Sequence, residues 1–302
     1  MKRKRSTGNK KLSLISSLLA VIIAVAMMIF IPEMTHEDIK DDSLGYFDYP
    51  FCVTFFDVGQ GDASLISCDG YYILVDGGEV EYSSTIINFL ESNGIKKLDA
   101  YVLTHPHSDH IGAAADIINS IECDKIFTTY FSEFNVPTTN VYERVLDAIY
   151  ESGAEPVAVE AGDSFRFGDL EIDIVAPIFE SEEYNAMSVV FTAQYKGSSV
   201  LFTGDTIKNV ENQMLDYGYN VDADVLKVAH HGSTTSNSEA FIEAVSPELA
   251  VISCGAGNSY GHPHDEIVQM FDEMEIEYIR TDYAGDIYYF GDGNTMYLET
   301  EK

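Results

Sequence analysis

The stretch VLTHPHSDHIG places three histidines and an aspartate within six positions, at the end of the apolar run LDAYVL. Such a cluster limits the fold to one that brings these side chains together. On an extended segment, residues two apart point the same way, so His105 and His107 can converge on one metal ion. Pro106 keeps the segment extended. Asp109 and His110 follow at the turn into a predicted helix, where they can reach a second ion.

Two further polar clusters end strand-like runs: Asp205 in LFTGD, and His230 with His231 in LKVAHHGS. Each lies where a buried strand reaches the surface, and ligands gather at such an edge of a sheet. Five of the eight histidines lie in the two short clusters, which disfavours an interpretation as scattered surface residues. Imidazole and carboxylate ligands suit zinc, with manganese or iron as alternatives.

The apolar periodicity predicts an α/β domain. From Phe51 the runs CVTFFDV, ASLISC and YYILVDGG read as strands, and a helix is predicted over Ser83 to Ser92. Later strands are FRFGDLEIDIVAP, MSVVFTAQY, VLFTGD, VLKVAHHG and LAVISCG; helices are HIGAAADIINSI, SEAFIEAV and DEIVQMFDEM, before a hairpin at GDGN. Two strand-rich halves with helices predict two packed sheets in one domain.

The N-terminus predicts a membrane segment. Residues 1–11 carry a basic cluster, and residues 12–32 supply about 20 apolar or small residues without charge, enough to cross the ~30 Å hydrocarbon core. The basic cluster should stay in the cytoplasm, which predicts a single-pass cell-membrane protein with an extracellular body. A cleavable signal peptide is the alternative, because Ala24 and Ala26 form an AxA pattern, and the protein would then be secreted.

The body is strongly acidic. Of 17 basic residues six precede the first acid, Glu33, so 11 basic residues face 50 acidic ones beyond residue 32. Residues 33–50 read as an acidic tether, which leaves residues 51–302 as the folded domain. Such acidity repels polyphosphates and anionic lipid, so nucleic acid is a disfavoured partner unless a local basic groove exists.

The motifs carry a family resemblance. HPHSDH resembles the HxHxDH signature of the metallo-β-lactamase superfamily, and Asp76 in ILVDGG, LFTGD and AHHGS match its other motifs. FFDVGQGDASLI, VDGG, NAMSVV, LFTGD, LKVAHHGS and YGHPHDE also occur in the order of the hydrolase domain of the ComEC type of competence protein. The resemblance covers about Phe51 to Gln269. It implies a four-layered αββα sandwich with a dinuclear metal site at one edge.

The resemblance also implies residue roles. The matched metal ligands are His105, His107, Asp109, His110, Asp205, His230 and His231. The first two would bind one ion, while Asp109, His110 and one of the paired histidines would bind the other. Asp205 would bridge both ions, and Asp76 would support them by hydrogen bonding.

Two departures from the superfamily pattern matter. Where most members have a third histidine for the first metal, this sequence offers Asn185, as the ComEC-like branch does. Its amide oxygen is a weaker ligand. The site could be labile or completed by His262 or His264, or Asn185 could only cap a turn. A competence protein of this type also has a polytopic channel, whereas one predicted span gives no channel here.

Weaker signals leave alternatives open. His262 and His264 precede a helix and could hold an anionic substrate group or form an ordinary loop. Asp57, Gln60 and Asp62 could reach the site, although a glycine-rich hairpin turn explains the glycines of DVGQGD equally well. The aromatic residues that could wall a pocket, or belong to the core, are Tyr130, Phe131 and Phe134.

The spacing of two cysteines suggests a cross-strand disulfide. If the first two strands form a hairpin that pairs Val58 with Ala63, Cys52 lies nearly opposite Cys68. A disulfide could then form in an oxidising compartment. The alternative is a pair of buried free thiols.

These observations predict an exported, membrane-anchored hydrolase with two divalent metal ions, zinc first and manganese as the alternative. The catalytic candidates are Asp109, Asp205, Asn185 and His262. Phosphodiester cleavage by a metal-bound hydroxide is the first choice, on a small or cell-envelope phosphoester, because the similar ComEC branch and exported phosphorylcholine esterases act on such bonds. The alternatives are a lactonase or β-lactamase-type hydrolase, and a metal-stabilised binding module without turnover.

Overall fold

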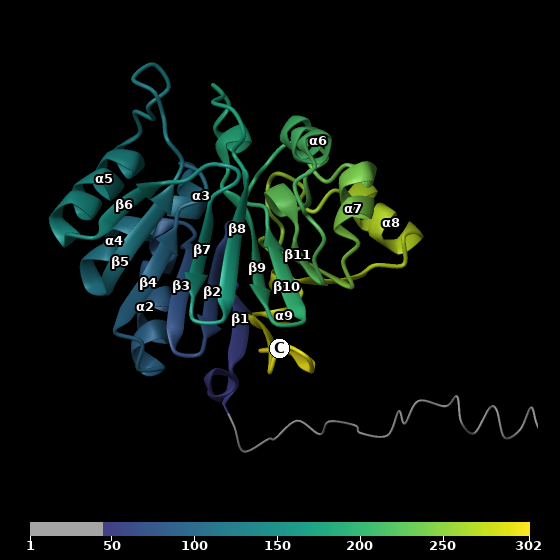
Figure 1. Cartoon of the computed structure of the whole chain (residues 1–302), viewed down its shortest axis with the longest axis horizontal. Helices are drawn as coiled ribbons and strands as arrows, with labels where there is room; N and C mark the ends of the chain where they lie inside the picture. Colours follow the sequence, from purple (N-terminus) through teal and green to yellow (C-terminus); the bar gives the residue numbers. More distant parts are fainter. Residues whose placement is uncertain (1–44) are drawn as a thin grey trace, which may run out of the picture. The chain divides into compact units, whose positions relative to one another are not determined.

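The computed structural model describes residues 45–302. The predicted basic segment 1–11, the hydrophobic segment 12–32 and most of the tether 33–50 lie outside this range. Within the described range, no helix combines the length and apolar character needed to cross a membrane. The described chain forms two β-sheets with helices on their outer faces (Figure 1).

The first sheet has eight strands in the order β15-β14-β1-β2-β3-β4-β5-β6. Its strands are β1 (Phe51–Phe55), β2 (Ala63–Cys68), β3 (Tyr71–Asp76), β4 (Lys97–Val102), β5 (Glu122–Thr128), β6 (Glu155–Ala158), β14 (Ile287–Gly291) and β15 (Met296–Thr300). The pairs from β3 to β6 are parallel, so the carboxyl ends of these four strands meet at one edge.

The second sheet has seven strands in the order β13-β12-β11-β10-β9-β8-β7. Its strands are β7 (Ser164–Phe167), β8 (Leu170–Ala176), β9 (Val190–Tyr195), β10 (Ser198–Phe202), β11 (Val225–Lys227), β12 (Leu249–Ile252) and β13 (Glu277–Arg280). The pairs from β10 to β13 are parallel, which again gathers carboxyl ends at one edge.

Helices cover the outer face of each sheet (Figure 1). One set is α2 (Ser83–Ser92), α4 (Ala114–Ser120) and α5 (Asn140–Ser152), and the other is α6 (Lys208–Tyr217), α7 (Glu239–Val245) and α8 (Asp265–Glu273). Short turns of helix are α3 (Ser108–Ile111), α9 (Thr281–Ala284), η1 (Tyr46–Asp48), η2 (Val80–Tyr82), η3 (Tyr184–Met187) and η4 (Ala229–Gly232).

Three apolar clusters separate the four layers. On β4, Ala100 and Val102 pack between the sheets, whereas Tyr101, together with Leu103 directly after the strand, packs under the outer helices. A third cluster joins the second sheet to α6, α7 and α8. A strand buried on both faces is continuously apolar, which explains the run LDAYVL. The predicted αββα arrangement of two sheets and outer helices is therefore confirmed.

One predicted helix has the expected bounds, and another is divided in two. The predicted helix Ser83–Ser92 has those bounds in α2. The predicted helix through HIGAAADIINSI is divided into α3 and α4 around Gly112. A Cβ on Gly112 would lie 2.4 Å from the Ser108 carbonyl oxygen and 2.7 Å from the Val80 nitrogen, so this close approach requires glycine.

The described end of the predicted tether packs on the domain. Tyr46 stacks on Tyr288 with ring centroids 4.1 Å apart, and Tyr49 meets Phe290 edge-on at 4.9 Å. Aromatic pairs of this kind contribute ~0.5–1.5 kcal/mol beyond their buried area. Residues 45–50 are thus attached to the first sheet.

The predicted register of the first hairpin is wrong by two residues, because Phe56 rather than Val58 lies opposite Ala63. Cys52 pairs with Ser67 and Phe51 pairs with Cys68. Adjacent residues of a strand face opposite sides, and Cys68 is next to Ser67, the partner of Cys52, so Cys68 packs between the sheets and Cys52 packs on the outer face. The two sulfurs point apart, and all four cysteines are buried free thiols.

We expect these thiols to be unreactive in the native protein. Burial raises the pKa of Cys52 to about 12 and that of Cys123 to about 12, so little reactive thiolate forms at neutral pH. Alkylation should be slow under native conditions and label all four cysteines in denaturant. Peptide mass spectrometry of unreduced protein would contradict this if Cys52 and Cys68 were found cross-linked.

Candidate metal centre

The candidate centre lies where the loops after β4, β10 and β11 meet. The loop after β4 brings the histidine cluster, the loop after β10 brings Asp205, and the loop after β11 brings His230 and His231. A pocket of about 350 Å³ opens between them. Its lining residues are Gln60, His107, Ser108, Asp109, Asn185, Asp205, His230, His231, Tyr260 and His262.

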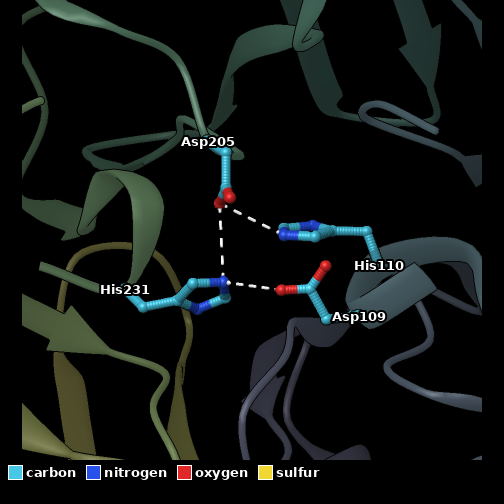
Figure 2. A group of neighbouring side chains, drawn as sticks. All are labelled: Asp109, His110, Asp205 and His231. Atoms are coloured by element: carbon cyan, nitrogen blue, oxygen red, sulfur yellow. Dashed lines mark ion pairs between the residues drawn. The ribbon is translucent and has the colours of Figure 1, made fainter. Parts of the chain in front are cut away.

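One group of four side chains converges from all three loops. It contains Asp109, His110, Asp205 and His231, whose candidate ligand atoms all lie within 4.8 Å of one another (Figure 2). His110 Nε2 lies 3.1 Å from Asp205 Oδ1, and His231 Nε2 lies 3.3 Å from Asp109 Oδ2. Two imidazoles and two carboxylates are a donor set suited to zinc and similar divalent ions.

A second group shares Asp205 with the first. It contains His105, His107 and Asp205, with candidate ligand atoms again within 4.8 Å of one another. His105 Nε2 faces His107 Nδ1 at 3.1 Å and lies 3.8 Å from Asp205 Oδ2. Asp205 presents Oδ1 to the first group and Oδ2 to the second, which is the geometry expected of a bridging carboxylate.

The residues fit divalent ions because several polar atoms lack other partners. His110 Nε2, Asp205 Oδ1 and His231 Nε2 are buried and make no hydrogen bond of normal geometry. Each buried polar atom left unsatisfied costs ~1–3 kcal/mol. These three atoms belong to the same convergent group, so a bound ion would satisfy all of them.

The charges in the centre depend on one another. Burial lowers the pKa of His110, but Asp205, Asp76 and Asp109 more than offset this and raise it well above its usual range. Burial raises the pKa of Asp205, but His110 and His231 hold it well below its usual range. Protons on these histidines thus balance the buried carboxylates, and bound metal ions would take the place of such protons.

Hydrogen bonds behind the ligands fix their orientation. Asp76 accepts from the Thr104 amide at 2.9 Å, from the Thr104 hydroxyl at 2.7 Å and from His110 Nδ1 at 2.7 Å. His231 Nδ1 likewise donates to the Ser253 carbonyl at 3.0 Å. With Nδ1 engaged, Nε2 of each ring is directed into the centre. The predicted hydrogen-bonding role of Asp76 is thus present.

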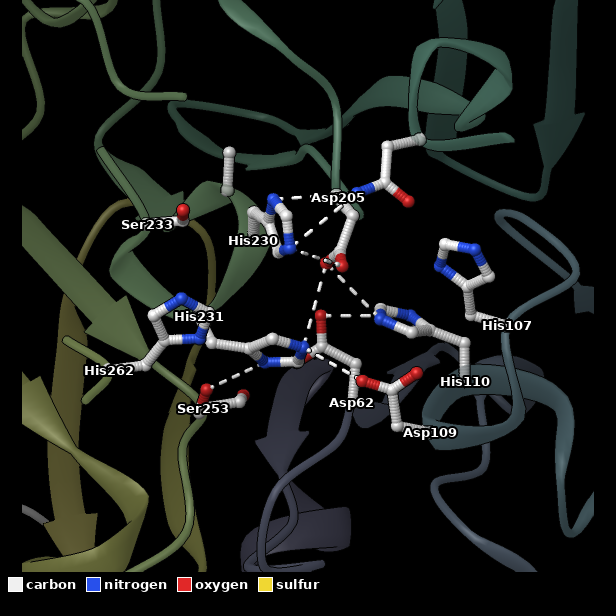
Figure 3. A network of polar contacts seen from close by, with 12 residues as sticks. Asp62, His107, Asp109, His110, Asp205, His230, His231, Ser233, Ser253 and His262 are labelled. Carbon is white, nitrogen blue, oxygen red and sulfur yellow. Dashed lines mark hydrogen bonds and ion pairs between the residues drawn. The ribbon is translucent and has the colours of Figure 1, made fainter. Parts of the chain in front are cut away.

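The two adjacent histidines of AHHGS have different environments (Figure 3). His231 belongs to the four-residue group, whereas His230 lies at the pocket wall with Nδ1 3.0 Å from Thr235 Oγ1 and Nε2 3.5 Å from Asp205 Oδ2. Both have left-handed backbone conformations, at φ 51° and 54°. That conformation costs ~1–2 kcal/mol per residue, and such strain is concentrated at functional sites.

Asn185 and His262 both line the pocket, and each lies beside His230. The Asn185 amide nitrogen is 3.4 Å from His230 Nδ1, and its buried oxygen has no hydrogen-bond partner. His262 stacks on Tyr260 at 5.7 Å and meets Gln60 Nε2 at 3.5 Å. Both side chains can contact a molecule in the pocket.

His264 has a different place. Its Nδ1 accepts from the Thr234 amide at 2.9 Å, and it is absent from the lining of the metal pocket. Of the three polar residues in DVGQGD, Gln60 lines the pocket and Asp62 lies 4.0 Å from His110 Nδ1. Asp57 instead pairs with Lys302 at 3.0 Å.

Sequence reasoning missed Lys227. It is only 2% exposed, and its Nζ donates to Asp62 Oδ2 at 2.7 Å and to the Val228 carbonyl at 3.2 Å. The Asp62 amide in turn donates to the Asp109 carbonyl at 3.0 Å. The sequence did contain an indication of this pair. Lys227 interrupts the apolar strand VLKVA, and a fully buried lysine needs a partner.

The αββα sandwich, with histidines and carboxylates gathered at the carboxyl ends of its strands, is the architecture of a metallohydrolase. Residues 56–256 match the family model described as metallo-beta-lactamase superfamily. The chain belongs to that superfamily, whose members are generally metal-dependent hydrolases.

Curated relatives support the resemblance to competence proteins. ComE operon protein 3 of Bacillus subtilis is 34% identical over 78% of this chain and 32% of the relative. Competence protein ComA of Neisseria gonorrhoeae is 31% identical over 77% of this chain and 31% of the relative. The chain therefore spans about a third of the length of these relatives.

Solved structures show the same fold at low identity. The metallo-beta-lactamase fold protein YhfI of Bacillus subtilis has a TM-score of 0.53 at 13% identity and covers 82% of this chain and 99% of its own. Igni18, a metallo hydrolase of Ignicoccus hospitalis, has a TM-score of 0.51 at 18% identity, covering 83% and 100%. CmlA of Streptomyces venezuelae, a diiron β-hydroxylase, has a TM-score of 0.53 at 12% identity, covering 77% and 53%.

Proposed function

We propose that this chain is a dinuclear metallohydrolase that cleaves phosphodiester bonds. The observation that carries the proposal is Asp205, whose two carboxylate oxygens face two separate groups of ligand atoms at the floor of an open pocket. Bound divalent ions would supply Lewis acidity and a water of lowered pKa, near 7. The first ion would be held by His105, His107 and Asp205, and the second by Asp109, His110, Asp205 and His231.

The remaining pocket residues would bind and orient the substrate. The side-chain amide of Asn185 lines the same pocket as the imidazole of His230. His262 and Gln60 present further polar atoms to this pocket. The amide nitrogens of Asn185 and Gln60 and the imidazoles can donate to the non-bridging oxygens of a phosphodiester and hold it in one orientation, which lowers the entropic barrier to reaction.

The substrate we propose is a small or cell-envelope phosphoester rather than DNA. None of the residues that line the pocket is a lysine or arginine. A protein that grips a polynucleotide usually neutralises several phosphates with such residues. One phosphodiester carries a single negative charge, and the bound ions would supply the positive charge that neutralises it.

This choice predicts the relative rates on two kinds of substrate. With zinc or manganese at physiological salt, turnover of a chromogenic phosphodiester and of a choline-bearing phosphoester should exceed that of single-stranded DNA. The comparison uses one enzyme preparation, with a chelator-treated sample as the blank. Because the named relatives are competence-type proteins, faster cleavage of DNA is the informative opposite result and would replace the small substrate by a nuclease function.

Three other functions are compatible with the fold. A lactonase or β-lactamase-type hydrolase would use the same ion pair on a carbonyl centre, and hydrolysis of a lactam or lactone panel tests it. CmlA, a diiron β-hydroxylase, shows that the fold also hosts oxidation. Zinc-dependent activity under anaerobic conditions would exclude oxidation here. A binding module without turnover would bind metal and show no activity on any substrate.

We also propose that segment 12–32 anchors the protein in the cell membrane with the body outside. The support is the sequence pattern of a basic cluster followed by an uncharged apolar run. Carbonate-resistant membrane association and digestion of the body by protease added to whole cells are the expected results. Mature protein that begins after the apolar run would show cleavage and secretion instead.

A further inference from the structure

A second pocket opens at the same end of the sandwich as the metal centre. It also has a volume of about 350 Å³, and it is lined by residues that follow β5, β6 and β8. The strands β5 and β6 are parallel to β4, and β8 runs in the direction of β10 because both are antiparallel to β9. The topology therefore places this pocket beside the metal centre.

The two pockets flank the short helix η3. Asn185 from η3 lines the metal pocket, and Met187 from the same helix lines the second pocket. One molecule that bound at the metal centre could therefore extend across η3 into the second pocket.

Aromatic and acidic side chains together form the wall of the second pocket. Tyr130 is 66% exposed and Phe179 is 54% exposed, so both rings offer surface to a ligand. Three carboxylates, Glu160, Asp163 and Glu180, share the wall, and the lining contains no lysine or arginine. Glu180 accepts hydrogen bonds from the Ser132 amide and from Asn135 Nδ2, and Asp163 accepts one from the Glu160 amide, so these two carboxylates are held in place by neutral donors. The wall is thus strongly negative and partly aromatic.

A buried hydroxyl in the wall lacks a partner. Thr129 is 4% exposed and lines this pocket, and its Oγ1 makes no hydrogen bond with any other described residue. A buried polar atom without a partner is uncommon in native proteins and calls for a ligand or an explanation. The hydroxyl oxygen is an acceptor for a donor that enters the pocket.

The acidic and aromatic wall and the buried hydroxyl indicate which kind of ligand fits the second pocket. A divalent ion would need three or more converging ligand atoms, and every such group among the described residues lies at the metal centre. An organic cation suits the wall better, because aromatic faces and carboxylates both attract an ammonium group. We propose that the second pocket binds the ammonium group of an organic amine, with Thr129 Oγ1 accepting one of its N–H bonds.

The amine site is independent of the chemistry at the metal centre, since it needs neither a phosphate nor a bound ion. Its connection to catalysis, as a subsite for a phosphodiester that carries an amino group, rests on the proposed function. Methyl resonances of full-length protein labelled at methionine test the site directly, because Met187 lines it. A Met187→Leu variant assigns that resonance. Met270 in α8 and Met274 directly after it do not line the pocket and serve as internal references.

The probes are n-butylammonium chloride, its neutral counterpart n-butanol, and calcium chloride. We expect n-butylammonium to shift the Met187 resonance with saturation, at a Kd on the order of 1–10 mM, as for a ligand of a few heavy atoms. Phe179→Ala and Glu180→Gln should each weaken this binding ~3- to 10-fold. Tyr150→Ala, which removes a ring that is 89% exposed on α5, should leave it unchanged.

Three results would overturn the proposal: an equal Met187 shift with n-butanol, a larger one with calcium, or undiminished binding in both pocket variants. Thr129→Val separates a role in binding from a structural one. It should weaken n-butylammonium more than tetramethylammonium, which has no N–H to donate, and unfolding in urea should show no loss of stability. Amine binding in a protein without phosphodiesterase activity would retain this site and remove the proposed function.

Discussion

Asp205→Ala is expected to lose most of one bound ion, to weaken binding of the other, and to reduce hydrolysis on the order of 10³-fold or more. The carboxylate contributes to both groups of ligands, so its loss leaves each group one donor short. Changes to residues that merely support a metal ligand already cost ~10–100-fold, and loss of a shared ligand should cost more. Elemental analysis of metal per chain and turnover of a chromogenic phosphodiester measure the two effects.

Two control variants separate the loss of a shared metal ligand from the loss of any carboxylate and from the loss of a ligand to one ion. Asp147→Ala removes an exposed carboxylate on α5 and should leave metal content and activity unchanged. His231→Ala should lose the second ion while the group of His105, His107 and Asp205 keeps the first. Active wild-type protein that contains one ion or none would contradict a dinuclear centre.

The location of the metal centre could be predicted from the sequence because the ends of apolar runs mark the ends of strands. His105, Asp205 and His231 each come within a few residues of an apolar run, and parallel strands bring their carboxyl ends to one edge. Side chains more than 100 positions apart in the sequence are therefore placed together by topology. The same logic explains why the layers of helix and sheet were predicted correctly.

The details that sequence did not supply depend on single-residue geometry. Neither His230 nor His231 could be preferred from the motif, because the choice depends on two consecutive left-handed residues that direct one ring to Asp109 and the other to the pocket wall. Cys52 was placed nearly opposite Cys68 but pairs with Ser67, and a displacement of one residue is enough to reverse a face.

Weak patterns account for the other omissions. Helix α6 was not predicted, and only Val210 and Met214 of its apolar residues are buried, which gives a faint helical period. Lys227 was given no role, although its place in a buried strand required a partner. Its partner, Asp62, is 165 positions away, and no local pattern connects the two.

The pair formed by Lys227 and Asp62 leads to the second large prediction. Lys227→Met should lower the free energy of unfolding by ~3–5 kcal/mol, because it leaves the Asp62 carboxylate buried without its cation. Asp62 already has one oxygen without a hydrogen-bond partner and lies near His110 and Asp76. Its backbone also holds the Asp109 carbonyl, so metal affinity should fall together with stability. Urea titration gives the stability, and metal titration gives the affinity.

A double variant distinguishes an ion pair from simple packing. Asp62→Leu with Lys227→Met removes both charges, and replacing a buried pair by apolar residues is often nearly neutral, so the double variant should be more stable than Lys227→Met alone. Arg144→Met is the matched control, since Arg144 pairs with Asp116 at 2.9 Å with both side chains substantially exposed. That change should cost less than ~1 kcal/mol. Equal losses for Lys227→Met and Arg144→Met would mean that the buried pair contributes no more than a surface contact.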